Sequence, residues 1–338
     1  MSNAVTLKKI FACVILFASS SFAQSTVSDI SSMPGAFSRM GFGARGIGMG
    51  NAMSAVRDGS LVSYYNPALA PFQEGNSFQT SYSILSLNRS LNFLNYTRRF
   101  ELGKKESADG TVKPRSVAGI SVGIINAGVS KIDARDNQGR KTGDISTSEN
   151  QFFVAVANRF SEKLSIGIAF KFFYYKLYES VTSTGLGFDL GALYLLNENM
   201  TLSFMLSDIN SKYEWDTGKI YGTNGNITKN KFPLLKKIGF SYKFDEPKII
   251  AALEFENSDG GTNFIRAGGE YNIYENLFLR AGFDRLNISN FDFPARPTFG
   301  FSYFHSMNSV KLGIDYAFVI EPYSTGSQHI IGINVNFY

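Results

Sequence analysis

The feature that most constrains this chain is a strict alternation of polar and apolar residues, repeated from Asn76 to the C-terminus in segments of about ten to twelve residues. Such alternation places one set of side chains on each face of a β-strand. From Leu164 to Tyr174, the even positions are all apolar or aromatic, and most residues between them are small. The pattern returns at 310–318 and 331–338. It predicts an all-β protein.

Fourteen segments follow this pattern. Their approximate spans are 76–87, 90–100, 115–126, 149–160, 164–177, 184–196, 200–208, 234–244, 247–257, 263–273, 276–284, 296–306, 308–319 and 327–338. Tight links alternate with longer connections near 127–148, 209–233 and 285–295; the tight links are at 161–163, 197–199, 245–246, 274–275 and 306–307. Short turns at one end and long loops at the other are typical of outer-membrane barrels. The long 101–114 link falls at the short-turn end and breaks this rule.

Alternation alone does not separate a membrane barrel from a soluble sandwich, in which the apolar face points inward. The strands, however, are longer than the five to six residues typical of globular proteins, and aromatic residues make up 14% of the chain. The chain also ends in a strand with the aromatic pair Phe337–Tyr338. A sheet in hydrocarbon must close on itself to satisfy its backbone. We therefore expect a 14-stranded antiparallel transmembrane β-barrel at 76–338, with outer-membrane lipid around it.

The N-terminus has the three parts of a secretory signal peptide: the basic pair Lys8–Lys9, an apolar run at 10–18, and the small residues of Ser21–Phe22–Ala23. A buried N-terminal helix is the alternative. We expect cleavage after residue 23 and export to the cell outer membrane of a diderm bacterium. The single cysteine, Cys13, would leave with the leader, and the net charge would fall from +5 to +3. No basic block indicates nucleic-acid binding.

The 24–75 region lacks the alternation and is rich in glycine, which suits a segment threaded compactly inside a barrel. We therefore expect an N-terminal plug. Five of its glycines, Gly41, Gly43, Gly46, Gly48 and Gly50, fall within ten residues, and Asn66–Pro67–Ala68 is expected to initiate a turn.

Charged residues of both signs occupy positions that the alternation directs into the barrel. These are Glu254, Arg266, Glu270, Arg280, Asp284, Lys311 and Asp315. The favoured interpretation is a structural lattice of salt bridges; the alternative is a ligand-binding or gating surface.

Two enzyme motifs occur without their required context. Residues 41–46 match G-x-G-x-x-G but lack a preceding strand and a suitably placed acid. Residues 119–123 match G-x-S-x-G but lie in an alternating segment rather than at a strand-to-helix elbow, so Ser121 is expected to face the lumen. His305 and His329 are the only histidines, and no metal-ligand spacing is present. We expect no catalytic residues, no metal and no cofactor.

The 37–52 segment, FSRMGFGARGIGMGNA, resembles the N-terminal signature of the PorV/PorQ family, a branch of the FadL-like outer-membrane barrels, as do Asp58 and the 64–70 segment, YYNPALA. The likeness continues at 161–167, 187–194, 279–283 and 311–318. Gly59 departs from it, because the family often has a second acid there. The resemblance implies a 14-stranded barrel whose N-terminal segment plugs the lumen. The plug motif that it implies consists of Gly41, Gly43, Ala44, Arg45, Gly46, Gly48, Gly50, Asp58, Asn66, Pro67 and Ala68.

The resemblance implies two functions. The first is an accessory role in type IX protein secretion, through binding a translocon or secreted cargo. The second is FadL-like passive transport of hydrophobic compounds such as long-chain fatty acids, which Phe173 and Tyr175 on the expected inward face also favour. A structural barrel without transport is a third alternative. All three are non-catalytic.

Overall fold

The structure is a computed structural model that describes residues 30, 33–106, 112–178, 181–289, 295–322, 324 and 326–338. The expected signal peptide at 1–23 and the beginning of the expected plug lie outside the described residues.

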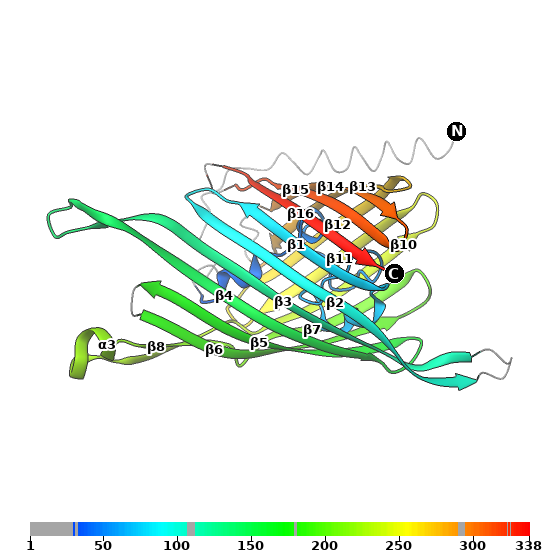
Figure 1. The fold of residues 1–338 in the computed structure, drawn as a ribbon, viewed down its shortest axis with the longest axis horizontal. Helices are drawn as coiled ribbons and strands as arrows, with labels where there is room; N and C mark the ends of the chain where they lie inside the picture. The colour runs from blue at the N-terminus through cyan, green and yellow to red at the C-terminus, as the bar shows by residue number, and fades with distance from the viewer. Residues whose placement is uncertain are drawn as a thin grey trace.

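Fourteen strands form one closed antiparallel barrel (Figure 1). Around the wall they are β1 (Asn76–Ile84), β2 (Arg89–Glu106), β3 (Val112–Arg135), β4 (Lys141–Arg159), β5 (Leu164–Tyr178), β6 (Val181–Leu195), β7 (Met200–Ile209), β10 (Leu235–Phe244), β11 (Ile249–Ser258), β12 (Asn263–Tyr274), β13 (Leu277–Asn287), β14 (Arg296–Met307), β15 (Val310–Val319) and β16 (Gln328–Phe337). The first and last strands pair from Asn76–Phe337 to Ile84–His329 and so close the wall. The expected strand number and fold are confirmed.

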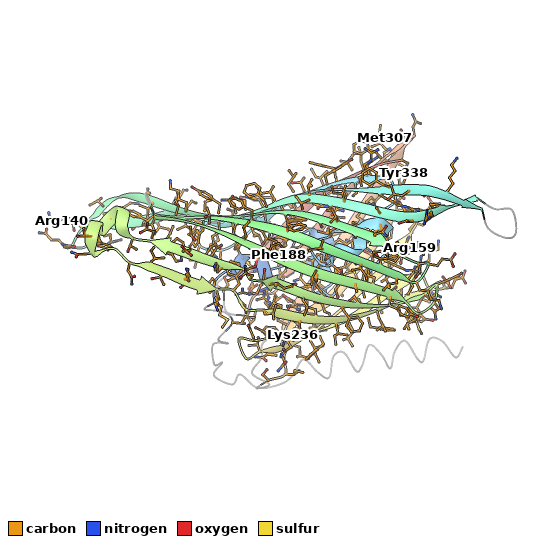
Figure 2. The ribbon with its side chains drawn as sticks, turned by 90° about the horizontal axis from the view of Figure 1, so that it is seen from below. Arg140, Arg159, Phe188, Lys236, Met307 and Tyr338 are labelled. Atoms are coloured by element: carbon orange, nitrogen blue, oxygen red, sulfur yellow. The ribbon has the colours of Figure 1, made fainter. Side chains whose placement is uncertain are left out.

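The five tight links lie at one end of the barrel, where both the first strand begins and the last strand ends. Figure 2 places Met307 and Tyr338 at this end, which we call the turn end, and Arg140 at the opposite, loop end. The irregular 101–114 link is also at the turn end. Here β2 and β3 remain paired as far as Lys104–Pro114 and beyond, so the link is a hairpin that extends past the other turns.

The prediction of a loop at 127–148 was wrong. Strands β3 and β4 continue through most of this region, and pairs such as Val129–Thr147 and Arg135–Lys141 join them almost to the hairpin tip. Pairing persists because main-chain hydrogen bonds hold two strands together without an apolar face. The polarity pattern therefore stops before the strands do.

The predicted loop at 209–233 also contains regular structure. It holds β8 (Lys212–Asp216), the short helices α3 (Gly218–Tyr221) and η4 (Gly222–Asn224), and β9 (Ile227–Lys231). Strands β8 and β9 form a separate two-stranded sheet, and β8 also packs against β6.

The two faces of the wall differ as the alternation predicts. Ile314 on β15 points outward with 60% of its surface exposed, whereas its neighbour Asp315 is buried. Outward-facing Leu253, Phe301 and Ile333 are likewise exposed, and Figure 2 shows Phe188 on this outer face. The outside of the barrel wall is thus predominantly apolar. Among the described residues, no helix is long and apolar enough to cross a membrane.

The described stretch before β1, residues 33–75, is compact and contains three short helices: η2 (Ala36–Arg39), α2 (Ala44–Gly48) and η3 (Pro67–Phe72). We call residues 33–75 the N-terminal segment; it is drawn in blue in Figure 1. Helix α2 contacts β13 to β16, and η3 contacts β2 to β6. The segment therefore spans the barrel interior from one side of the wall to the other.

Candidate functional site

The N-terminal segment approaches the wall so closely that several wall residues have no room for a side chain. A Cβ atom on Gly268 of β12 would lie 2.1 Å from the carbonyl oxygen of Met49, and one on Gly191 of β6 would lie 2.0 Å from Oδ1 of Asn66. Both distances are far below van der Waals contact. Glycine at these positions lets the two backbones meet directly.

The Asn66–Pro67–Ala68 motif fixes the start of η3. The Asn66 side chain accepts a hydrogen bond from the Ala68 amide at 3.0 Å. Its amide group donates to the Ser54 and Ala192 carbonyls, at 3.2 and 3.3 Å. One buried side chain thus caps a helix and ties the segment to itself and to β6.

The glycine-rich motif forms a tight structure rather than a nucleotide-binding loop. Gly41 and Gly43 have φ angles of 90° and 73°, which other residues rarely adopt. The Tyr65 hydroxyl lies against this turn, accepting from the Phe42 amide at 3.0 Å and lying 2.7 Å from Oδ1 of Asn51. Burial raises the pKa of Tyr65. Within 33–75 no strand precedes α2, which agrees with our rejection of the dinucleotide motif.

A buried ion pair joins the N-terminal segment to the wall. Arg45 donates to Glu270 through Nε and Nη2, both at 2.8 Å, and its Nη1 donates to the Ser60 carbonyl at 2.9 Å. Glu270 also accepts from Nε of Arg280 at 2.6 Å. Burial by itself lowers the pKa of Arg45, but the Glu270 carboxylate more than offsets this, and the pKa is raised.

Arg266 organises a second buried cluster. Its guanidinium lies 2.8 Å from Asp284, 3.1 Å from Glu256 and 3.3 Å from Glu254. The Glu254 carboxylate also accepts from the Ser54 amide at 3.3 Å, so this cluster too reaches the N-terminal segment.

Six of the seven expected lumen charges therefore lie buried in ion pairs, including Asp315, which is 3.9 Å from Arg280. The seventh, Lys311, is only partly buried, with Nζ 4.9 Å from the centre of the Phe304 ring. Asp58, by contrast, pairs with Lys243 at 2.9 Å in a partly exposed position. Ser121 faces the lumen as expected, fully buried, where it donates to Asn95 at 2.8 Å.

Part of this buried charge network involves residues that were not among the expected lumen charges. Lys171 on β5 pairs with Asp189 at 2.7 Å and with Asp208 at 3.0 Å, and all three are buried. Glu256 was likewise not among the expected lumen charges, although it shares the inward parity of Glu254. Parity places Lys171, Asp189 and Glu256 inside the barrel. It would place Asp208 outside, because the buried positions earlier in β7 are the odd ones; Asp208 points inward at an irregularity near the end of the strand, where its φ is 63°.

An aromatic cluster fills the loop-end half of the interior. Phe173 is fully buried, with its ring 4.8 Å from Phe232 and 6.3 Å from Tyr213, between ring centres. Tyr213 in turn lies 5.6 Å from Trp215 on the β8–β9 sheet. The same core continues to Phe42 of the N-terminal segment. Phe173 and Tyr175 were expected on this face; the contributions of β8 and of Phe232, which follows β9, were not, because these residues lie in the predicted loop.

The described residues contain no group of three His, Cys, Asp or Glu side chains placed to hold a metal ion. His329 lies on the outer face, where Nδ1 is 2.7 Å from the Tyr316 hydroxyl.

The fold defined by this wall is found among solved structures of transport proteins. The toluene transporter TodX of Pseudomonas putida superposes with a TM-score of 0.57 at 15% identity, over 87% of this chain and 96% of that one. A FadL homologue from Pseudomonas aeruginosa superposes with a TM-score of 0.50 at 10% identity, over 86% and 96%. A mutant of TodX, described as a monoaromatic hydrocarbon channel, gives 0.56 at 15% identity over 87% and 97%.

The chain therefore has the 14-stranded fold of the FadL-like barrels. No protein-family model and no curated protein matches the sequence.

Proposed function

We propose that the protein resides in an outer membrane and conducts small hydrophobic compounds passively. Membrane residence is supported by the closed wall and its predominantly apolar outer face, since hydrocarbon excludes open sheet edges. The fold shared with TodX and the FadL homologue supports the same location.

The aromatic cluster is the observation that carries the transport proposal. It begins at Trp215 near the loop end and continues through Phe173 to Phe42 inside the barrel. Ligand sites for apolar molecules are lined mainly by apolar and aromatic side chains. A water-filled porin, by comparison, has a polar lumen. The cluster gives a hydrophobic compound a favourable environment inside the wall.

We further propose that the N-terminal segment is the plug of this barrel. Its contacts with β2 to β6 and with β13 to β16 obstruct straight passage through the centre. Passage then requires the segment to shift or a ligand to follow its edge. Buried ion pairs such as Arg45–Glu270 hold the segment in place, which favours the structural role of the lumen charges.

Uptake measurements test the transport proposal. Cells lacking their own hydrophobic-compound channels would express either this protein or an empty vector, and uptake of labelled toluene and labelled oleate would be compared. We expect faster uptake with the protein for at least one compound. The W215S variant should slow uptake, whereas Y221S, an exposed aromatic in the same loop region, should not. Equal uptake with protein and vector would exclude transport of these compounds.

The secretion role implied by the PorV/PorQ resemblance stays a prediction that rests on the motif residues alone. Deletion of the gene followed by analysis of surface and secreted proteins tests it. An unchanged set of these proteins would argue against this role.

A further inference from the structure

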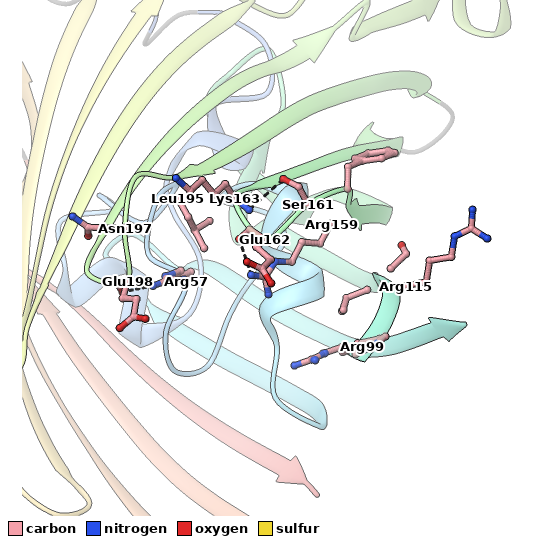
Figure 3. Close-up of a pocket in the computed structure, with 14 residues that line it drawn as sticks. Arg57, Arg99, Arg115, Arg159, Ser161, Glu162, Lys163, Leu195, Asn197 and Glu198 are labelled. Carbon is pink, nitrogen blue, oxygen red and sulfur yellow. Dashed lines mark hydrogen bonds between the residues drawn. The ribbon is translucent and has the colours of Figure 1, made fainter. Parts of the chain in front are cut away.

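A cavity of about 810 Å³ opens at the turn end of the barrel, away from the aromatic cluster. Its walls come from the β4–β5 turn, the β6–β7 turn, the N-terminal segment, and the extended β2–β3 hairpin that the sequence left unexplained (Figure 3). Cavities that hold small ligands commonly have about 300–1,000 Å³. The hairpin extension therefore completes a compartment of ligand size.

Positive charge predominates in the lining of this cavity. The charged lining residues are Arg57, Arg99, Arg115, Arg159, Lys163, Glu162 and Glu198, five cationic against two acidic. Figure 3 shows the side chains of Arg57 and Arg159 near one another, whereas Arg115 extends away from them. Both acidic residues engage these arginines through their main chain: the Glu198 carbonyl accepts from Arg57, and the Glu162 carbonyl accepts from Arg159.

Two of the arginines keep unused donors. Nε of Arg99 and Nε of Arg159 are buried and make no hydrogen bond within the described part of the chain. Arg159 is held in position by stacking on Phe72, 5.2 Å from the ring centre, and by its 2.7 Å bond to Glu162. Arg99 also pairs with Glu101, whose carboxylate is largely exposed and accepts from Nη2 of Arg99. An exposed ion pair of this kind contributes little to stability. A buried donor without a partner is costly.

We propose that this cavity binds an oxyanion, a phosphate or carboxylate group, on Arg57, Arg99 and Arg159. The planar fork of a guanidinium matches the oxygens of such groups and forms charge-assisted hydrogen bonds with them. The apolar side chains of Val117, Phe160 and Leu195 in the same lining would contact whatever carries the group. The carrier is either a soluble molecule or the headgroup of a lipid in the adjoining leaflet.

Binding titrations of the full-length mature protein in zwitterionic detergent test this site. Inorganic phosphate represents the soluble anion and dihexanoyl phosphatidylglycerol the headgroup, with calorimetry as the readout. We expect saturable binding of at least one probe, weakened by added sodium chloride. Phosphate binding identifies a soluble anion; binding of the lipid alone identifies a headgroup. Binding of neither probe overturns the proposal.

Variants connect the binding to these arginines. R99Q/R159Q should weaken it about tenfold, since each substitution removes a charged donor. R135Q is the matched control, because Arg135 also pairs with a single exposed carboxylate but lies on the β3–β4 hairpin at the loop end. R57Q tests the site from the N-terminal segment without altering the wall, should the double variant fail to fold. Equal affinity in wild type, R57Q and R99Q/R159Q would refute the assignment. Hydrocarbon uptake is a separate measurement, so either proposal can fail alone.

Discussion

Arg45 and Glu270, 225 positions apart in the chain, form a buried bidentate pair with both N–O distances at 2.8 Å. Arg45 lies on α2 of the N-terminal segment, and Glu270 lies on β12 of the wall. The pair therefore holds the expected plug against the barrel. Breaking it tests whether the segment is fixed by charge.

The R45M variant should release or loosen the N-terminal segment. Removing one partner of a buried pair typically costs about 3–5 kcal/mol, and we expect the lower part of this range because Glu270 keeps Arg280 at 2.6 Å. Urea unfolding in detergent and trypsin cleavage within 33–75 would measure the effect. The R135M control removes an exposed pair and should cost at most about 1 kcal/mol. Equal protease resistance of R45M and wild type would contradict the prediction.

Alanine substitutions of two adjacent glycines on β12 should have different effects on stability. G268A places a methyl group 2.1 Å from the Met49 carbonyl, whereas the nearest atom to a Cβ on Gly269 is 3.8 Å away. We expect G268A to cost about 1–3 kcal/mol through overpacking and to increase protease access to the segment. G269A should behave as wild type in the same unfolding assay. Similar behaviour of the two variants would show that the segment does not press on the wall.

Alkaline pH should destabilise the N-terminal segment through Tyr64 and Tyr65. Burial raises the pKa of both above the usual value. Above about pH 10 the unfolded tyrosines lose their protons while the folded ones keep them. Stability should therefore fall by up to about 1.4 kcal/mol per pH unit for each tyrosine.

Unfolding of wild type and Y64F/Y65F at pH 8 to 11 would measure this difference. The double variant loses the hydroxyl bonds at all pH values, including that of Tyr64 to Ser38, but should show a shallower alkaline decline. Parallel pH profiles would contradict the assignment.

A charged side chain on the outer face should destabilise the barrel if this face contacts lipid, as we propose. Ile314 lies in the middle of β15 and points outward. A lysine at the bilayer midplane of a barrel costs about 2–4 kcal/mol, so I314K should fold into lipid vesicles at a lower urea concentration than wild type. I227K, on the equally exposed β9 outside the wall, is the control and should fold normally. Normal folding of I314K would argue against lipid contact.

The barrel wall could be predicted from the sequence because the direction of each side chain in a strand depends only on its position along that strand. Side chains in a strand alternate between its two faces, so Leu164 to Tyr174 already reveals which residues point outward. Fourteen such segments joined by alternating short and long links define the strand number. The same parity is sufficient to place Arg266 and Glu270 inside the barrel.

The tertiary structure decided which side chains contact one another. Arg45 meets Glu270, and Lys171 meets Asp189 and Asp208, only because closure of the wall brings these strands and the N-terminal segment together. Strand ends at 127–148 were also decided by pairing, since main-chain hydrogen bonds extend beyond the apolar belt. The arginine-lined cavity required the β2–β3 hairpin, two turns and the segment to converge. Polarity read along one strand carries no information about such contacts, because they depend on the register and packing of distant parts of the chain.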